Sequence, residues 1–256
     1  MFATRQEIRA AAGHLIICGF EGTSVGPELR EIMRDVSPLG LILFARNIES
    51  AEAVTELNRE LKALRREPLL LSVDQEGGRV ARVKAPATVW PPMRRVGEHG
   101  DPALAKAVGE ALARELRAMN FDVDYAPVLD VDTNPKNPVI GDRSFSREPR
   151  QVAELGAAFT QGLQGAGVGG CGKHFPGHGD TDVDSHLALP KVSHELDRLR
   201  EVEWPPFAAA IEAGIGAIMS AHVLVESLDR VPATLSPKIL RSFLRGELKF
   251  EGVIIS

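Results

Sequence analysis

Residues 39–74 contain LGLILFA (39–45), then VTELNRELKAL (54–64), then LLLSVD (69–74), and this order of patterns identifies the fold class. The two outer runs are short and almost continuously apolar, which is typical of strands buried on both faces of a parallel sheet. Between them, apolar side chains recur every three or four residues from Val54 to Leu64, which predicts an amphipathic helix. We interpret the segment as one right-handed βαβ unit.

The same alternation of short apolar runs and helical patterns continues along the chain. The runs that we interpret as strands are His14–Cys18, Leu39–Ala45, Leu69–Asp74, Phe121–Ala126, Val168–His174, Ala217–His222 and Val253–Ser256. Such alternation fits either a TIM (β/α)8 barrel or an open doubly wound sheet. The open sheet commonly carries G-x-G-x-x-G after its first strand, and Gly19-Phe20-Glu21-Gly22 lacks that spacing. We therefore predict an α/β TIM barrel, truncated after strand seven, as a single catalytic domain over residues 1–256.

Composition limits the classes of function. The chain has 256 residues, 44% of them hydrophobic, so it can bury a full-sized core. Its net charge of −5, with no run of Lys or Arg, disfavours nucleic acid as a partner. The N-terminus has no signal-peptide pattern, and no apolar run approaches the roughly 20 residues of a membrane span. Cys18 and Cys171 both fall in predicted buried strands and suggest no disulfide framework. We expect a cytoplasmic monomer that does not bind membranes and acts on a small molecule.

Polar residues gather at the carboxyl ends of the predicted strands, where TIM barrels place their active sites. Asp74 ends the third predicted strand, and His222 ends the sixth. Lys173 and His174 end the fifth, and a long polar loop, 130–147, follows the fourth. We therefore expect the active site at this end of the barrel.

Four side chains have the chemistry to bind a polyhydroxylated ligand. Arg82, Arg143 and Lys173 can donate hydrogen bonds to hydroxyl groups, and the carboxylate of Asp74 can accept two at once. Taken alone, Arg82 is equally compatible with a surface charge, and Asp74 with a helix cap.

The segment Lys173–His186, KHFPGHGDTDVDSH, is the densest in histidine and aspartate. Asp184 and His186 stand two apart, so both side chains face the same side of an extended backbone. A carboxylate bonded to one imidazole nitrogen leaves the other nitrogen free to deliver a proton. The spacing therefore predicts that Asp184 and His186 form a catalytic acid/base pair.

The same segment permits a second interpretation, a divalent metal site. Its ligands would come from His174, His178, Asp180, Asp184 and His186. Lys173 would place a cation close to any such metal, which disfavours this interpretation.

The chain resembles a known family in three separate motifs. Lys173–His186 is similar to the signature K-H-[F/I]-P-G-H-G-x4-D-S-H of glycoside hydrolase family 3. VDQEGGRV at 73–80 and NPVIGDRSF at 137–145 resemble motifs of its bacterial β-N-acetylglucosaminidases of peptidoglycan recycling. The likeness extends from about Gly13 to Ser256, with the motifs in the family's order.

The resemblance implies a TIM-barrel β-N-acetylhexosaminidase. Such an enzyme releases non-reducing-end β-linked N-acetylglucosamine, with retention of configuration, from muropeptides of the GlcNAc-1,6-anhydro-MurNAc type. The resemblance implies no metal and no organic cofactor. It implies sugar-binding positions at Asp74, Arg82, Arg143, Lys173 and His174, the acid/base at His186, and its dyad partner at Asp184.

The family's nucleophile is an aspartate directly after the seventh strand, and the sequence ends at Ser256, one residue before that position. We therefore expect the 256 residues alone to catalyse little hydrolysis. Two alternatives stay open. A β-N-acetylglucosaminide phosphorylase would fit a histidine acid/base, which carries no negative charge to repel phosphate. A sugar-binding pseudo-enzyme would fit a chain without a nucleophile.

Overall fold

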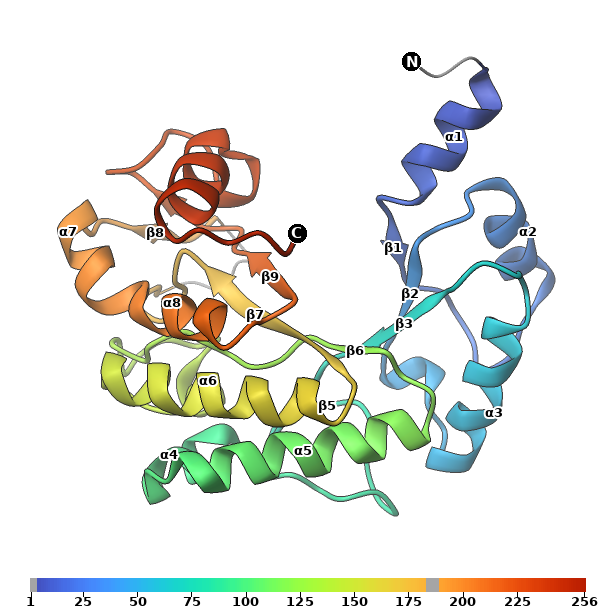
Figure 1. Ribbon diagram of the computed structural model, residues 1–256, viewed down its shortest axis with the longest axis horizontal. Helices are drawn as coiled ribbons and strands as arrows, with labels where there is room; N and C mark the ends of the chain where they lie inside the picture. Colours follow the sequence, from blue (N-terminus) through green and yellow to red (C-terminus); the bar gives the residue numbers. More distant parts are fainter. Residues whose placement is uncertain (1–3, 183–188) are drawn as a thin grey trace.

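The computed structural model describes residues 4–182 and 189–256, and its centre is one curled parallel sheet (Figure 1). In spatial order the strands are β1 (Ile17–Cys18), β2 (Gly40–Leu43), β3 (Leu70–Val73), β6 (Val123–Asp124), β7 (Gly169–Phe175), β9 (Ala217–Ser220) and β11 (Val253–Ile255). Every neighbouring pair is parallel. Six of the seven predicted runs contain one of these strands, and β7 exceeds its run by one residue, Phe175, so the predicted alternation is confirmed.

Helices lie between the strands in the sequence, and several of them, such as α3, α5 and α6, cover the outer face of the sheet, whereas α1 precedes the first strand and extends away from it (Figure 1). The helices are α1 (Arg5–Gly13), α2 (Pro27–Asp35), α3 (Ala51–Lys62), α4 (Met93–His99), α5 (Pro102–Ala118), α6 (Pro149–Gly165), α7 (Leu196–Arg198), α8 (Pro205–Glu212), the short turns η1 (Ala45–Asn47), η2 (Gly141–Arg143) and η4 (Ala233–Leu235), and the π-helical η3 (Leu199–Glu203) and η5 (Lys238–Glu247). Helix α3 contains most of the predicted helical pattern and begins at Ala51, where the Ser50 side chain caps it by accepting a hydrogen bond from the amide of Ala53. Its Val54, Leu57 and Leu61 are buried.

Helices α5 and α6 approach each other closely because glycines lie at their contact. A Cβ atom on Gly109 would lie 2.5 Å from the carbonyl oxygen of Phe159, and one on Gly162 would lie 2.0 Å from that of Lys106. Any side chain at either position would push the helices apart. Helix α6 leads into β7 and packs against it, so this contact helps to place the strand that carries Lys173.

The segment after β3 folds into an antiparallel hairpin of β4 (Gln75–Gly77) and β5 (Val80–Ala81), which the sequence pattern did not predict. The Gln75 side chain holds the hairpin together: its oxygen accepts from the amides of Arg82 and Val83 at 2.8 and 3.0 Å. The turn needs positive φ at Gly77 and Gly78, which glycine adopts without strain. The two strands are only three and two residues long, too short for a strand periodicity to be detected in the sequence.

The strands β1 and β11 are the outer strands of the sheet and, in the described parts of the chain, do not pair with each other. Nevertheless Ile17 of β1 and Ile254 of β11 line the same cavity, so the sheet curls round it. Apolar side chains stay open to solvent at both edges, with Leu15 87% and Val253 57% exposed. The described residues therefore form an open, barrel-like α/β fold.

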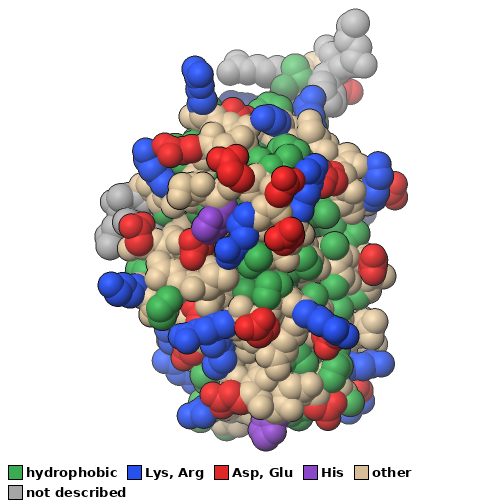
Figure 2. Space-filling model, turned by 90° about the vertical axis from the view of Figure 1, so that its left-hand side faces the viewer, with side chains coloured by type: hydrophobic (Ala, Val, Ile, Leu, Met, Phe, Trp, Pro, Cys, Tyr) green, Lys and Arg blue, Asp and Glu red, His purple; other side chains and the backbone are tan. Residues whose placement is uncertain are grey.

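The surface and the cysteines refine two expectations from composition. Basic and acidic side chains are interspersed over the face shown in Figure 2. Among the described residues, the helices are too short or too polar to cross a bilayer. Cys171 is buried as predicted, but Cys18 is only half-buried because its strand lies at an edge of the sheet.

Candidate active site

A cavity of about 980 Å³ lies inside the curl of the sheet and extends from residues before β1, such as Leu15, to the carboxyl ends of the strands. The charged and ionisable side chains in its lining include Asp74, Glu76, Arg82, Arg143, Lys173 and His174. The fold thus brings together all five positions that the sequence assigns to sugar binding. His222 also lines this cavity, at its exposed end.

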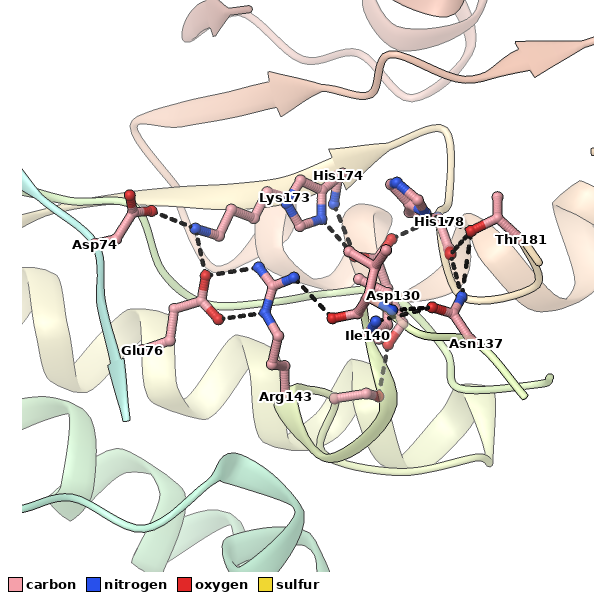
Figure 3. Close-up of polar contacts among 12 residues, drawn as sticks. Asp74, Glu76, Asp130, Asn137, Ile140, Arg143, Lys173, His174, His178 and Thr181 are labelled. Carbon is pink, nitrogen blue, oxygen red and sulfur yellow. Dashed lines mark hydrogen bonds and ion pairs between the residues drawn. The ribbon is translucent and has the colours of Figure 1, made fainter. Parts of the chain in front are cut away.

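Lys173 is the centre of a buried ion-pair network (Figure 3). Its Nζ lies 2.7 Å from Oδ1 of Asp74 and 2.5 Å from Oε1 of Glu76. Arg143 binds the same Glu76 carboxylate in a bidentate manner, with both nitrogen–oxygen distances at 2.8 Å. The paired geometry fixes both cations with little rotational freedom.

Burial and charge pairing together set the ionisation of this network. Burial alone would raise the pKa of Glu76, but Lys173 and Arg143 outweigh it and hold that pKa at about 2. Burial would also lower the pKa of Lys173, yet Glu76 and Asp74 raise it above the ordinary value. Glu76, Lys173 and Arg143 therefore all carry full charge at neutral pH.

Asp74 and Arg82 are the more accessible members of the cluster. The side chain of Asp74 is 16% exposed, and its second oxygen, Oδ2, lies 3.6 Å from an Arg82 nitrogen. At that distance the two groups attract electrostatically without a direct hydrogen bond. Asp74 Oδ2 and the Arg82 guanidinium therefore retain hydrogen-bonding capacity toward a ligand in the cavity.

Asp130 orients the imidazole of His174. Its Oδ2 lies 2.7 Å from His174 Nδ1, and its Oδ1 accepts from the backbone amide of His178 at 2.7 Å. Burial would raise the pKa of Asp130, but His174 lowers it below the ordinary value, while burial lowers the pKa of His174. An ionised Asp130 and a neutral His174 place the proton on Nδ1, which leaves Nε2 as a hydrogen-bond acceptor.

The loop after β6 supports the residues that follow β7. The Asn137 side chain accepts from the amides of Val139 and Ile140 and donates to the carbonyl of His178 at 2.8 Å (Figure 3). The carbonyl of Val139 in turn accepts from Arg143 at 3.1 Å. One amide side chain therefore joins the loop that carries Arg143 to the segment that follows Lys173.

Two residues of this arrangement are missing from the set chosen by sequence, Glu76 and Asp130. Both are buried carboxylates that bind other side chains of the site; Glu76 also lines the cavity, whereas Asp130 is not part of its lining. A signal existed for each. Glu76 stands two residues after Asp74, and Asp130 opens the polar loop after the fourth predicted strand. Their partners are distant in sequence, so the pairing itself could not be predicted.

The predicted acid/base pair, Asp184 and His186, lies outside the described residues. The same two residues also belong to the set of ligands considered for a metal site. In residues 4–182 and 189–256, no group of three or more His, Cys, Asp or Glu side chains is placed to hold a metal ion. Of the remaining members of that set, His174 binds Asp130, and His178 Nδ1 lies 2.7 Å from Thr181 Oγ1.

Comparisons with known proteins place this site in context. The family model for the glycosyl hydrolase family 3 N-terminal domain matches residues 11–256. A beta-hexosaminidase of Nitrosomonas eutropha is 45% identical over 223 residues, which cover 85% of this chain and 64% of the relative. One from Pseudomonas aeruginosa is 42% identical over 236 residues, or 92% of this chain and 70% of the relative.

Solved structures agree with these sequence matches. A glycoside hydrolase family 3 beta-N-acetylglucosaminidase from Paenibacillus sp. FPU-7 superposes with a TM-score of 0.93 at 40% identity, covering 96% of this chain and 48% of its own. NagZ from Neisseria gonorrhoeae, in complex with N-trifluoroacetyl-D-glucosamine, gives a TM-score of 0.89 at 39% identity, covering 94% of this chain and 73% of its own.

The chain thus spans 64% to 70% of the length of these two curated relatives and about half of the Paenibacillus protein. Within that span the sequence motifs, the strand order and the family match agree. On these grounds the chain belongs to glycosyl hydrolase family 3.

Proposed function

We propose that this protein acts as a retaining exo-β-N-acetylglucosaminidase. The observation that carries the proposal is the convergence of Asp74, Lys173 and His174 on one cavity of a family 3 chain. The names of the similar proteins, beta-hexosaminidase and beta-N-acetylglucosaminidase, support the same reaction class.

In this proposal, the buried network binds the terminal sugar. Asp74 accepts hydrogen bonds from two hydroxyl groups of the sugar, and Lys173 and Arg82 donate to its oxygens. His174 contributes Nε2 as an acceptor, because Asp130 holds the proton at Nδ1. Glu76 does not contact sugar; it keeps Lys173 and Arg143 in place.

The chemical steps follow those of a retaining glycosidase. An aspartate nucleophile attacks the anomeric carbon while His186, oriented by Asp184, protonates the departing oxygen. Water then cleaves the glycosyl-enzyme, with His186 acting as the base. A histidine suits both roles near neutral pH, because its unperturbed pKa is about 6.5.

We place the nucleophile directly after Ser256, at the end of the seventh strand of a full TIM barrel. Supporting this placement, Ile255 and Ser256 line the same cavity as Lys173 and Asp74. A residue that follows Ser256 therefore starts from the cavity wall.

For the substrate, we propose muropeptides of the GlcNAc-1,6-anhydro-MurNAc type, processed in the cytoplasm during peptidoglycan recycling. The enzyme would act as a monomer without a metal or organic cofactor. The support is the likeness of the three motifs to the bacterial subgroup and the neighbouring NagZ structure with an N-acylglucosamine analogue.

Hydrolysis of 4-nitrophenyl N-acetyl-β-glucosaminide by the natural full-length protein tests the proposal. Nuclear magnetic resonance of the released sugar should detect the β-anomer first. The matching glucoside should react far more slowly, and a chelator should leave the rate unchanged. A product with inverted configuration, or equal rates on both sugars, would overturn the proposal.

Two further measurements distinguish the alternatives. Formation of N-acetylglucosamine 1-phosphate when phosphate is added would identify a phosphorylase. Binding of N-acetylglucosamine without turnover by the full-length protein would identify a sugar-binding pseudo-enzyme.

A further inference from the structure

A second aspartate–histidine pair lies outside the sugar-binding network. His194 Nε2 is 2.6 Å from Asp180 Oδ2, and the imidazole N–H donates to the carboxylate. Asp180 precedes the segment that contains Asp184 and His186, and His194 follows it. The bond therefore joins the two ends of the segment that carries the candidate acid/base.

Asp180 is fixed to the loop that follows β6. Its other oxygen, Oδ1, accepts from the hydroxyl of Thr133 at 2.8 Å. The neighbouring residue, Gly179, packs so closely on Val131 that a Cβ atom would lie 1.7 Å from the Val131 carbonyl oxygen. The side chain of Asn134 donates to the carbonyl of Thr181. The backbone on both sides of Asp180 is thus held by one neighbouring loop.

His194 is fixed to a different part of the molecule. Its carbonyl accepts from the hydroxyl of Ser227 at 2.5 Å. Just before it, β8 (Lys191–Val192) pairs in parallel with β10 (Leu224–Val225), which follows β9. The Asp180–His194 bond thus connects two independent supports, the loop after β6 and the segment after β9.

Two more charged groups lie near His194. Glu203 is buried, and burial raises its pKa, an effect that Arg198 and His194 oppose. An Arg198 nitrogen lies 3.3 Å from Glu203 Oε1. Arg198 and Glu203 thus form an ion pair in the helical segment that follows His194.

We propose that Asp180 and His194 are positioning residues: their bond holds together the described stretches on either side of residues 183–188 and thereby supports the acid/base role proposed for Asp184 and His186. The inference rests on the proposed function. Tying the ends of a loop reduces the conformations open to its residues. Proton transfer depends steeply on placement, since a misplacement of about 1 Å can cost about 100-fold in rate.

Four variants of the full-length protein test the proposal: His194→Ala, His194→Gln, Asp180→Asn and the control Lys191→Ala. Glutamine keeps an N–H that can donate to Asp180. The control removes an exposed ion pair of the same segment, Lys191 with Glu226 at 2.8 Å, which does not connect the two supports. Thermal unfolding measures how far each substitution acts through stability alone.

The decisive readout is the dependence of the rate on the leaving group. For His194→Ala and Asp180→Asn we expect kcat to fall about 10-fold or more on an alkyl or disaccharide substrate, but less than about 3-fold on a dinitrophenyl glycoside, which needs little protonation. His194→Gln should recover most of the loss, and Lys191→Ala should show none. Equal losses on both substrates, or no recovery by glutamine, would overturn the positioning role.

Hydrogen–deuterium exchange separates this inference from the proposed function. In His194→Ala, amides of β8 should exchange about 5-fold faster, whereas those of β3 and β7 should not change. Unchanged exchange in β8 would overturn the proposed positioning role of the Asp180–His194 bond even if the enzyme is active. A wild-type protein that neither cleaves nor binds N-acetylglucosamine would refute the proposed function, and the exchange result would still decide whether Asp180 and His194 tie the segment.

Discussion

The buried charge network around Lys173 and the Asp180–His194 pair, here called the clamp, are both built from charge pairs, yet their surroundings differ. In the network, the side chains of Lys173 and Glu76 are 3% and 2% exposed. In the clamp, those of His194 and Asp180 are 23% and 32% exposed. A buried network loses much stability when one partner is removed, whereas a solvated pair contributes little to stability. The comparison separates a buried, rigid network in the proposed sugar site from a weaker, partly exposed pair that is proposed to have a positioning role.

The largest expected effect concerns the centre of the network. Replacing Glu76 with Gln should lower the free energy of unfolding by about 5 kcal/mol, because it leaves two buried cations without their shared carboxylate. Urea denaturation measures this loss. Glu226→Gln, at an exposed ion pair, is the matched control and should change it by less than about 0.5 kcal/mol. Similar values for both variants would show that the network is not electrostatically coupled.

His186, the proposed proton donor, gives the next effect. His186→Ala should reduce kcat about 1,000-fold on substrates with poor leaving groups, and less than about 10-fold on dinitrophenyl glycosides. Steady-state kinetics across a series of aryl leaving groups measures the difference. A uniform loss across the series would exclude His186 as the acid.

Acid should act on the network through Glu76. The pKa of Glu76 in the folded state is about 2, below its ordinary 4.5, so its contribution to stability is complete above pH 4.5. As the pH falls from 4.5 toward 2, about 3 kcal/mol should be lost. Urea titrations at several pH values measure the slope. Glu76→Gln should lack this component, and an identical slope in both proteins would contradict the assignment.

Asp74 should affect binding more than folding. Its replacement with Ala should weaken binding of N-acetylglucosamine about 30-fold, because two charge-assisted hydrogen bonds are lost. Glu76 still neutralises Lys173, so the protein should remain folded. Calorimetric titration measures the affinity. Arg79→Ala, at the rim of the same cavity, should change it less than about 3-fold, since Arg79 bonds mainly to the carbonyls of Pro138 and Val139.

The sequence predicted regular features well because their causes are local. Buried strands are continuous apolar runs, and α3 has its own cap at Ser50, so both can be identified from neighbouring residues. The position of charged residues at the carboxyl ends of strands could also be interpreted, because barrel folds place their active sites there. Asp74, Lys173 and His174 were therefore found as members of one site.

What escaped prediction depends on tertiary pairing. Glu76 matters because two cations from distant segments converge on it, and Asp130 because it binds a ring 44 residues away. The β4–β5 hairpin and the π-helical turns of η3 and η5 have no apolar periodicity of their own. The clamp was missed for the same reason. Asp180 and His194 meet because contacts with other parts of the chain, such as Thr133 and Ser227, hold each of them in place.

The span between Asp74 and Lys173 has a consequence for how the protein acquires its site. Their bond joins residues 99 positions apart, one at the end of β3 and the other in β7. Contacts of such long range form slowly, because a large loop must close before they contribute any energy. Ligand binding should therefore appear late in refolding, after most helices have formed. The rate at which ligand binding returns would then measure how fast β7 docks in the sheet. Far-ultraviolet circular dichroism reports that step poorly.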